Sequence, residues 1–264
     1  GAKGYVSVED VLEAITPRTA LVSLCAANAL TGVINPCSAI AELCEERGIY
    51  LHFEISQLIG RSHIDVEELG AELISFGGEH LHGPKGTGLL WMKRGTELSP
   101  FIVGGSDQGG RRAGTLNNPG LAGLAEAARL AMDNLDHVCL ETARLRDKFE
   151  TEVLRIFPKA QVCFKDLERT PTTSCIAFPG IANEALLYYL NKRGVYACIG
   201  GGGQQQIALV LKAAGFDEEV ANCALSFSLS GETTEAEIDE ALAALDESVH
   251  QLQRLSNECY ENGE

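Results

Sequence analysis

Two apolar runs, residues 19–26 (TALVSLCA) and 49–54 (IYLHFE), lie on either side of a helical pattern in the first half of the chain. Both runs have the length and the bulky apolar side chains of buried strands. Between them, Pro36 precedes a helical segment at 39–47, and Gly48 ends it. A strand, a helix and a second strand in this order predict a βαβ unit, whose two strands lie parallel in one sheet.

The same alternation continues along the chain. A third and a fourth strand are predicted at 73–77 (LISFG) and 88–93 (GLLWMK). Ligands of parallel α/β sheets bind at the carboxyl ends of the strands. The loops that follow Ala26, Glu54 and Gly77 are therefore candidate binding loops on topology alone.

A loop rich in glycine and asparagine, 101–118, and two helices, 121–135 and 141–156, lead to a second alternating region. Its predicted strands lie at 161–165, 174–179, 195–198 and 225–230, and its predicted helices at 183–193, at 205–214 and from a capping box at Thr234 and Glu237 to about Cys259. The chain is therefore predicted to form an α/β fold with two domains, 1–135 and 136–264.

Composition and charge exclude several classes of protein. The 264 residues are long enough for a sizeable core, and 45% of them are hydrophobic. No apolar run reaches the ~20 residues of a membrane span, and no signal peptide is visible at the start. The formal net charge of −16 repels phosphate backbones and anionic lipid, so neither a nucleic-acid nor a membrane partner is expected.

The nine cysteines indicate a reducing compartment. Their number is odd, their spacing is scattered, and no C-x-x-C pair occurs. This pattern argues against a disulfide framework and against a thiolate zinc site, and it predicts a cytoplasmic protein.

Five ionisable residues gather around two predicted strand ends: His52, Glu54, Glu79, His80 and His82. His52 and Glu54 are two apart on one strand and so point to the same face. Imidazole and carboxylate groups can bind a divalent metal or act as general acid and base, and both hypotheses stay open on the residues alone. The alternative to both hypotheses is a structural one, in which Glu79, His80 and His82 are solvated loop residues and His52 is a core histidine with its hydrogen bonds satisfied.

Several stretches in chain order resemble motifs of one enzyme family and extend over nearly the whole chain. They are 20–23 (ALVS) followed by Asn28 and Gly32, 51–57 (LHFEISQ), 74–86 (ISFGGEHLHGPKG), 104–115 (from GG to RAGT), and 227–229 (FSL) with 233–235 (TTE). The family resembled is that of the cysteine desulfurases and selenocysteine lyases, the NifS-like class V aminotransferases. The resemblance implies the fold type I architecture of transferases dependent on pyridoxal 5′-phosphate (PLP). This is a mostly parallel sheet flanked by helices, followed by a smaller α/β carboxy-terminal domain.

The chain departs from the family at the positions that carry the chemistry. In the family a lysine forms the internal aldimine with PLP, an aspartate pairs with the pyridine nitrogen, and an arginine binds the substrate carboxylate. The lysine position holds His80, whose imidazole cannot form the aldimine. Glu54 stands at the aspartate position and Ser226 at the arginine position. Glu79 and Gly77 replace the histidine and serine that hold the phosphate.

Other positions keep the family pattern. Asn28 and Gln57 match residues that hydrogen-bond the PLP ring oxygen, and Thr115 matches one that reaches the phosphate of the neighbouring subunit. Cys198 precedes a run of four glycines, and we take it as the counterpart of the family's persulfide cysteine. Lys85 lies in the Gly-Pro-Lys-Gly segment, where the family has a second lysine, so it is not expected to replace the missing one.

The family usually carries a further amino-terminal segment, which supplies a phosphate-binding Gly-Thr loop and a histidine that stacks on the PLP ring. The sequence is therefore expected to be a fragment, or to belong to a homologue without that half of the pocket.

The resemblance and the departures together give three hypotheses of function. The first is a catalytically impaired desulfurase homologue that keeps the fold and the family's homodimer and scaffolds or regulates a sulfur-transfer partner. The second is an active PLP enzyme that releases sulfur or selenium from cysteine or selenocysteine. The third is a metal-binding protein that uses His52, Glu54, His80 and His82.

Overall fold

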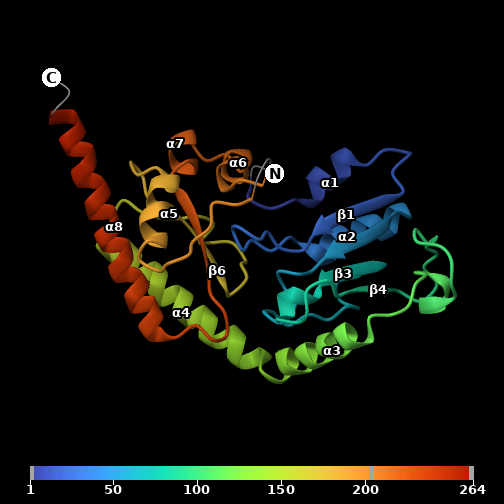
Figure 1. Ribbon diagram of the computed structural model, residues 1–264. Helices are drawn as coiled ribbons and strands as arrows, with labels where there is room; N and C mark the ends of the chain where they lie inside the picture. Colours follow the sequence, from blue (N-terminus) through green and yellow to red (C-terminus); the bar gives the residue numbers. More distant parts are fainter. Residues whose placement is uncertain (1–2, 202–204, 262–264) are drawn as a thin grey trace. The chain divides into compact units, whose positions relative to one another are not determined.

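The computed structural model describes the backbone of residues 3–201 and 205–261, and the side chains as far as Leu255 within the last helix. The chain forms two compact units (Figure 1). Unit 1 consists of 1–11, 27–36 and 136–264, and unit 2 consists of 12–26 and 37–135. The assignment of 1–135 and 136–264 to two domains stays a prediction. In the described part of the chain, no helix has both the length and the apolar character needed to span a bilayer.

Unit 2 is built on a four-stranded sheet in the order β1 (Leu21–Cys25), β2 (Tyr50–Glu54), β3 (Leu73–Gly77) and β4 (Gly88–Met92). The first three strands are parallel, and β4 returns antiparallel to β3. The helix α2 (Cys37–Arg47) connects β1 to β2. The predicted βαβ unit and both later strands are confirmed within two residues at each end.

The sheet of unit 2 buries one face. Phe53 and Leu51 of β2 are 0% and 1% exposed and lie in the core with Ile40 of α2. His52 and Glu54, at the intervening positions of β2, point to the opposite face and stay partly accessible. The alternation therefore places the candidate site residues on the face that the α2 core does not use.

The other elements of unit 2 and its borders are α1 (Val8–Ala14), η1 (Gly78–Leu81), η2 (Asp107–Gly110) and α3 (Asn118–Asp133). The sequence interpretation missed α1, which is too short for a clear apolar period. Its start is nevertheless capped, because Ser7 N donates to Asp10 Oδ2 at 2.9 Å and Asp10 N donates to Ser7 Oγ at 3.2 Å.

Unit 1 contains a three-stranded antiparallel sheet in the order β5 (Gln161–Val162), β6 (Thr173–Ala177) and β7 (Ala224–Ser228). The predicted strand at 161–165 ends early, because a turn follows in which Phe164 has a left-handed φ of 58°. The predicted strand at 195–198 is wrong. Only Cys198 pairs with β7, through an isolated bridge to Ser226.

Helices cover both faces of this sheet. The helices described from Leu135 onward are α4 (Leu135–Ile156), α5 (Asn183–Asn191), α6 (Ile207–Ala213), α7 (Glu218–Ala221) and α8 (Glu235–Glu261). Along β6, Ile176 packs into the core shared with α4, α5 and α8, while Cys175 and Ala177 pack towards α6 and α7. The period-two alternation of a fully buried strand thus divides the apolar side chains between two cores.

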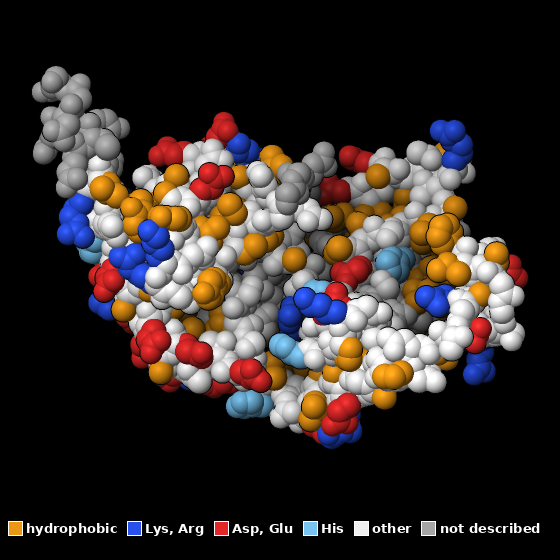
Figure 2. All heavy atoms as spheres, viewed as in Figure 1, with side chains coloured by type: hydrophobic (Ala, Val, Ile, Leu, Met, Phe, Trp, Pro, Cys, Tyr) orange, Lys and Arg blue, Asp and Glu red, His pale blue; other side chains and the backbone are white. Residues whose placement is uncertain are grey.

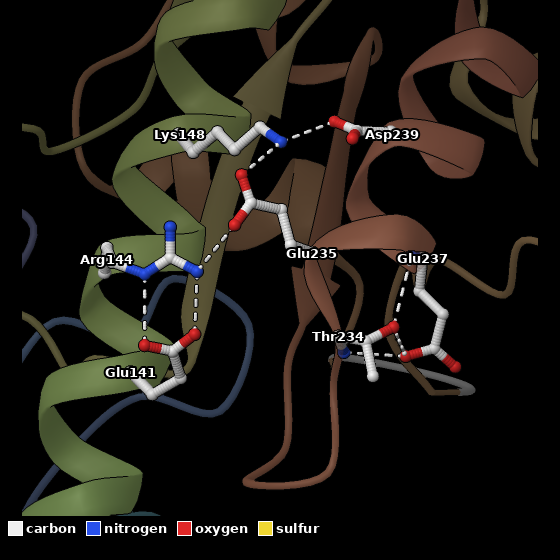
Figure 3. Close-up of polar contacts among 7 residues, drawn as sticks. All are labelled: Glu141, Arg144, Lys148, Thr234, Glu235, Glu237 and Asp239. Carbon is white, nitrogen blue, oxygen red and sulfur yellow. Dashed lines mark hydrogen bonds and ion pairs between the residues drawn. The ribbon is translucent and has the colours of Figure 1, made fainter.

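Charged side chains tie α4 to the start of α8 (Figure 3). Arg144 bonds to both Glu141 and Glu235, and Lys148 bonds to Glu235 and Asp239. Acidic side chains are exposed over this part of unit 1 in Figure 2. Single exposed ion pairs contribute little to stability, but a shared network restricts how the two helices can shift.

The predicted capping box at the start of α8 is confirmed (Figure 3). Thr234 N donates to Glu237 Oε2 at 2.7 Å, and Glu237 N donates to Thr234 Oγ1 at 3.3 Å. These two bonds satisfy backbone donors that the first helical turn leaves without partners.

Residues 27–36 belong to unit 1 although the flanking chain belongs to unit 2. Val33 bridges to Arg169, and Thr170 N donates to Gly32 O at 2.8 Å. Gly32 has a φ of 74°, and a Cβ there would lie 3.0 Å from atoms of Thr170 and Thr173. Both the backbone angle and the close approach require glycine here.

Candidate active site

The carboxyl ends of β1, β2 and β3 meet at one edge of the sheet in unit 2. Cys25 pairs with Glu54, and Glu54 pairs with Ser75. Across the strand ends, Ala26 N donates to Glu54 O at 2.8 Å and Ile55 N donates to Ser75 O at 2.9 Å. The loops predicted to carry a binding site therefore leave the sheet side by side.

The loop after β2 is tied to β3 and to its own helical turn. Glu54 Oε1 accepts a hydrogen bond from Ser56 N at 3.0 Å, and Ser56 Oγ accepts one from Gly77 N at 3.2 Å. Arg61 Nη1 donates to Gln57 Oε1 at 2.7 Å. Burial lowers the pKa of Arg61. The Arg61 guanidinium thus fixes the orientation of the Gln57 side-chain amide, which the resemblance places against the ring oxygen of a cofactor.

His52 bonds through both ring nitrogens to serines on the neighbouring strands. Ser23 Oγ lies 2.8 Å from Nδ1, and Ser75 Oγ lies 2.8 Å from Nε2. Burial lowers the pKa of His52, and the Glu54 carboxylate raises it to a smaller extent. The arrangement fits a neutral imidazole, which accepts from one serine and donates to the other.

The free energy of unfolding is expected to fall as pH is lowered from 7 through the ordinary histidine pKa of about 6.5. Because the folded-state pKa of His52 is lowered, the folded protein binds fewer protons than the unfolded chain in this window, so stability rises with pH. His52→Gln should reduce the slope of stability against pH, measured by urea unfolding at several pH values. His137→Gln, at an exposed position, is the control. An unchanged slope in His52→Gln would contradict the assignment.

The loop after β3 begins with two glycines that have close neighbours. A Cβ on Gly77 would lie 2.7–2.8 Å from the carboxylate atoms of Glu79, and a Cβ on Gly78 would lie 2.2 Å from Thr87 Oγ1. Gly78 N also donates to Thr87 O at 2.9 Å. The Glu79 carboxylate therefore occupies the space that a side chain at position 77 would need.

The two histidines of this loop differ in exposure. His80 lies half-buried in η1, whereas His82 is exposed and ends η1 with a left-handed φ of 59°. Lys85 is exposed in the following turn. Histidine side chains are visible over the sheet region of unit 2 in Figure 2.

The structure does not support the metal hypothesis. Among the residues that the structure describes, no three histidine, cysteine, aspartate or glutamate side chains are grouped so that they could hold a metal ion. His52, one of the four predicted ligands, already uses both ring nitrogens.

The remaining predicted site residues include three in unit 1. Asn28 Oδ1 accepts hydrogen bonds from Leu30 N at 2.9 Å and Thr31 N at 3.0 Å, which shapes its loop. Cys198 and Ser226 exchange two backbone hydrogen bonds of 2.8 Å. The Ser226 side chain is buried, whereas Cys198 is exposed and its Sγ accepts from Gly200 N at 3.1 Å.

Cys198→Ser is expected to change the free energy of unfolding by less than about 0.5 kcal/mol, because the thiol is exposed and the bridge to Ser226 uses backbone atoms. Cys175→Ser, at a position that is 0% exposed, should destabilise by about 1–3 kcal/mol because it buries a hydroxyl. Thermal unfolding of both variants tests this difference. A large drop for Cys198→Ser would place the thiol in the core.

Within unit 2 the structure brings Glu54, Gln57, Gly77 and Glu79 to one edge of the sheet, whereas Thr115 is exposed in the later loop.

The sequence interpretation missed Ser23, Ser75, Ser56 and Arg61. For Ser23 and Ser75, the sequence does contain a signal that could have placed them beside His52. Ser23, His52 and Ser75 each lie two residues before the last residue of their strands, so they share one face.

Comparison with known proteins gives one consistent answer. The model of the family described as aminotransferase class-V matches residues 1–241. The cysteine desulfurase of Cereibacter sphaeroides is 38% identical over 258 residues, which are 96% of this chain and 65% of that protein. The cysteine desulfurase NifS of Azotobacter vinelandii is 36% identical over 264 residues, which are 99% of this chain and 66% of that protein.

Solved structures agree with these relatives. A NifS-like protein aligns with a TM-score of 0.85 at 29% identity, covering 95% of this chain and 67% of that chain. DndA from Streptomyces lividans aligns with a TM-score of 0.71 at 30% identity, covering 87% and 66%. The chain spans 64–66% of the length of the curated relatives that it matches.

Proposed function

Because the chain belongs to the class-V aminotransferase family, we propose that it is a cysteine desulfurase-like homologue that has kept the fold of these PLP-dependent enzymes without their covalent catalysis. In this proposal the residues at the strand ends of unit 2 no longer bind PLP through a lysine. The protein then serves as a scaffold or regulator for a sulfur-transfer partner, in the homodimeric state common in its family.

One observation carries the proposal. The Glu79 carboxylate lies against Gly77, 2.7–2.8 Å from the position of a Cβ there. The family has a serine at position 77, a histidine at 79 and a lysine at 80, by the resemblance of residues 74–86. A serine side chain at 77 and this conformation of Glu79 exclude each other sterically. An anionic side chain thus takes the space of a residue that, by the resemblance, holds the phosphate in the family.

The residues at this edge do not fit PLP. The Glu79 carboxylate lies in the loop that holds the phosphate in the family, and a phosphate is repelled by nearby negative charge. His80 offers no amine for a covalent bond to the cofactor.

The experiment is a PLP titration of the purified full-length gene product, followed by visible absorbance and borohydride reduction. We expect no yellow band that survives gel filtration and no PLP–lysine adduct in the mass spectrum. An adduct on a lysine would overturn the proposal and favour an active enzyme on cysteine or selenocysteine. Lys85→Ala is the matched variant, because Lys85 is the exposed lysine next to this loop.

His80→Lys alone is expected not to restore desulfurase activity. The neighbouring Glu79 carboxylate would still repel the cofactor phosphate, and Ser226 would still lack the guanidinium that binds a substrate carboxylate. Sulfide release from cysteine is the readout. The combined change of Gly77→Ser, Glu79→His and His80→Lys should retain more PLP than His80→Lys. Sulfide release by the single variant would contradict this prediction.

A further inference from the structure

Unit 1 contains a cavity of about 360 Å³ that opens to solvent and is lined by the end of α4, the loop after β6 and the second half of α8. This volume lies within the range of small-molecule sites. The cavity shares no residue with the strand-end site in unit 2. A site here therefore does not depend on the function proposed above.

Aromatic and aliphatic side chains form the floor of the cavity. Phe157 and Phe178 meet edge to face, with ring centroids 6.0 Å apart, and Ile181 and Val249 lie beside them. Phe178 and Val249 are 3% and 1% exposed, so they belong to the folded core and hold the floor in place. Such a surface favours a flat or ring-shaped apolar group, because edge-to-face contacts add to apolar burial.

The polar residues at the rim of the cavity are basic or neutral, although the chain as a whole has a net charge of −16. They are Lys159, His250 and Gln253, and no described residue that lines the cavity is acidic. Lys159 makes no ion pair with any side chain that the structure describes. His250 on the rim pairs with a carboxylate outside the lining, because its Nε2 lies 3.3 Å from Asp246 Oδ1. The Lys159 ammonium group is therefore available to form an ion pair with an anionic ligand.

We propose that this cavity binds a small aromatic monocarboxylate, with the ring on the phenylalanine floor and the carboxylate at Lys159. Gln253, which also lines the cavity, can donate a second hydrogen bond to the carboxylate through Nε2. A phosphate ester is disfavoured, because its second negative charge would meet one cation and an apolar wall. A neutral aromatic compound would leave the Lys159 ammonium without a partner.

The probe is 3-phenylpropionate, with 3-phenylpropionamide as its neutral counterpart of the same shape. Saturation-transfer NMR with the full chain is expected to show binding of the acid with a Kd of about 1 mM or tighter. The amide should bind about fivefold more weakly, the loss expected for one solvent-facing ion pair. No binding of the acid, or equal binding of acid and amide, would overturn the proposal.

Three variants locate the site. Gln253→Trp covers the mouth from an exposed rim position and should abolish the signal. Lys159→Met should weaken binding of the acid about fivefold and leave binding of the amide unchanged. Lys165→Met, at an exposed lysine outside the cavity, is the matched control and should have no effect. Binding that persists in Gln253→Trp, or an equal loss in both lysine variants, would place the ligand elsewhere.

Discussion

Glu150→Ala is expected to lower the free energy of unfolding by about 3–5 kcal/mol. Glu150 lies on α4 and accepts hydrogen bonds from Arg169 at 2.8 and 3.2 Å and from Ser174 at 2.7 Å. The side chains of Glu150 and Arg169 are only 3% and 4% exposed. Removing the carboxylate leaves a guanidinium charge buried without its partner, which costs more than the intact pair contributes.

Denaturant unfolding measures this loss, and Glu152→Ala is the control. Glu152 lies two residues further along α4, and its partner Arg155 is 68% exposed, so its removal should change stability by less than about 0.5 kcal/mol. Replacing the pair together, Glu150→Leu with Arg169→Met, should cost less than Glu150→Ala because no charge is left alone. Equal losses for Glu150→Ala and Glu152→Ala would show that the buried pair does not matter.

Phe149→Ala is the second change with a large expected effect, a destabilisation of about 3–5 kcal/mol. Phe149 is 2% exposed, and its ring centroid lies 5.0 Å from that of Phe227 on β7. Truncation removes apolar burial and leaves a cavity in the core that α4 shares with the sheet, α5 and α8. The midpoint and slope of a denaturation curve give the loss.

Phe101→Ala provides the comparison, because the same substitution is made at a side chain that is 99% exposed. It should shift the free energy of unfolding by no more than about 0.5 kcal/mol. A Phe149→Ala protein as stable as the parent would mean that the core of unit 1 collapses onto the vacated space.

The strands of unit 2 could be predicted because local signals agreed there. Each strand combines a short apolar run with a nearby glycine or polar boundary, and Gly48 marks the end of α2. The capping box of Thr234 and Glu237 was equally readable, since both partners are three residues apart in sequence. Predictions that depended on neighbours close in sequence were therefore correct.

Predictions that depended on distant neighbours were less accurate. Residues 195–198 have strand-like side chains, but only Cys198 reaches a partner, at Ser226. The helix α1 was missed for a different reason, because its seven residues are too few to show a clear apolar period. A strand exists only where a neighbouring strand supplies its hydrogen bonds, and sequence periodicity contains no information about that neighbour.

In the candidate site, too, some features could be predicted from the sequence and others depended on distant neighbours. The residue types at the strand ends followed from the resemblance and from the rule for parallel sheets. The serines on both sides of His52 did not, because their hydrogen bonds depend on the register of three strands. The contact of Glu79 with Gly77 depends on the turn of η1, which no apolar pattern marks. The roles proposed for these residues stay predictions until the PLP titration is made.

The membership of residues 27–36 in unit 1 has a consequence for biosynthesis. Val33 and Gly32 take their backbone partners from Arg169 and Thr170, which leave the ribosome only after the whole of unit 2 has been made. The strands β1 to β4 come from a shorter stretch of chain, so their pairing closes smaller loops at a lower entropic cost. We therefore expect the nascent chain to assemble the sheet of unit 2 first, and the segment that carries Asn28 to dock only after residues 169–170 have been made.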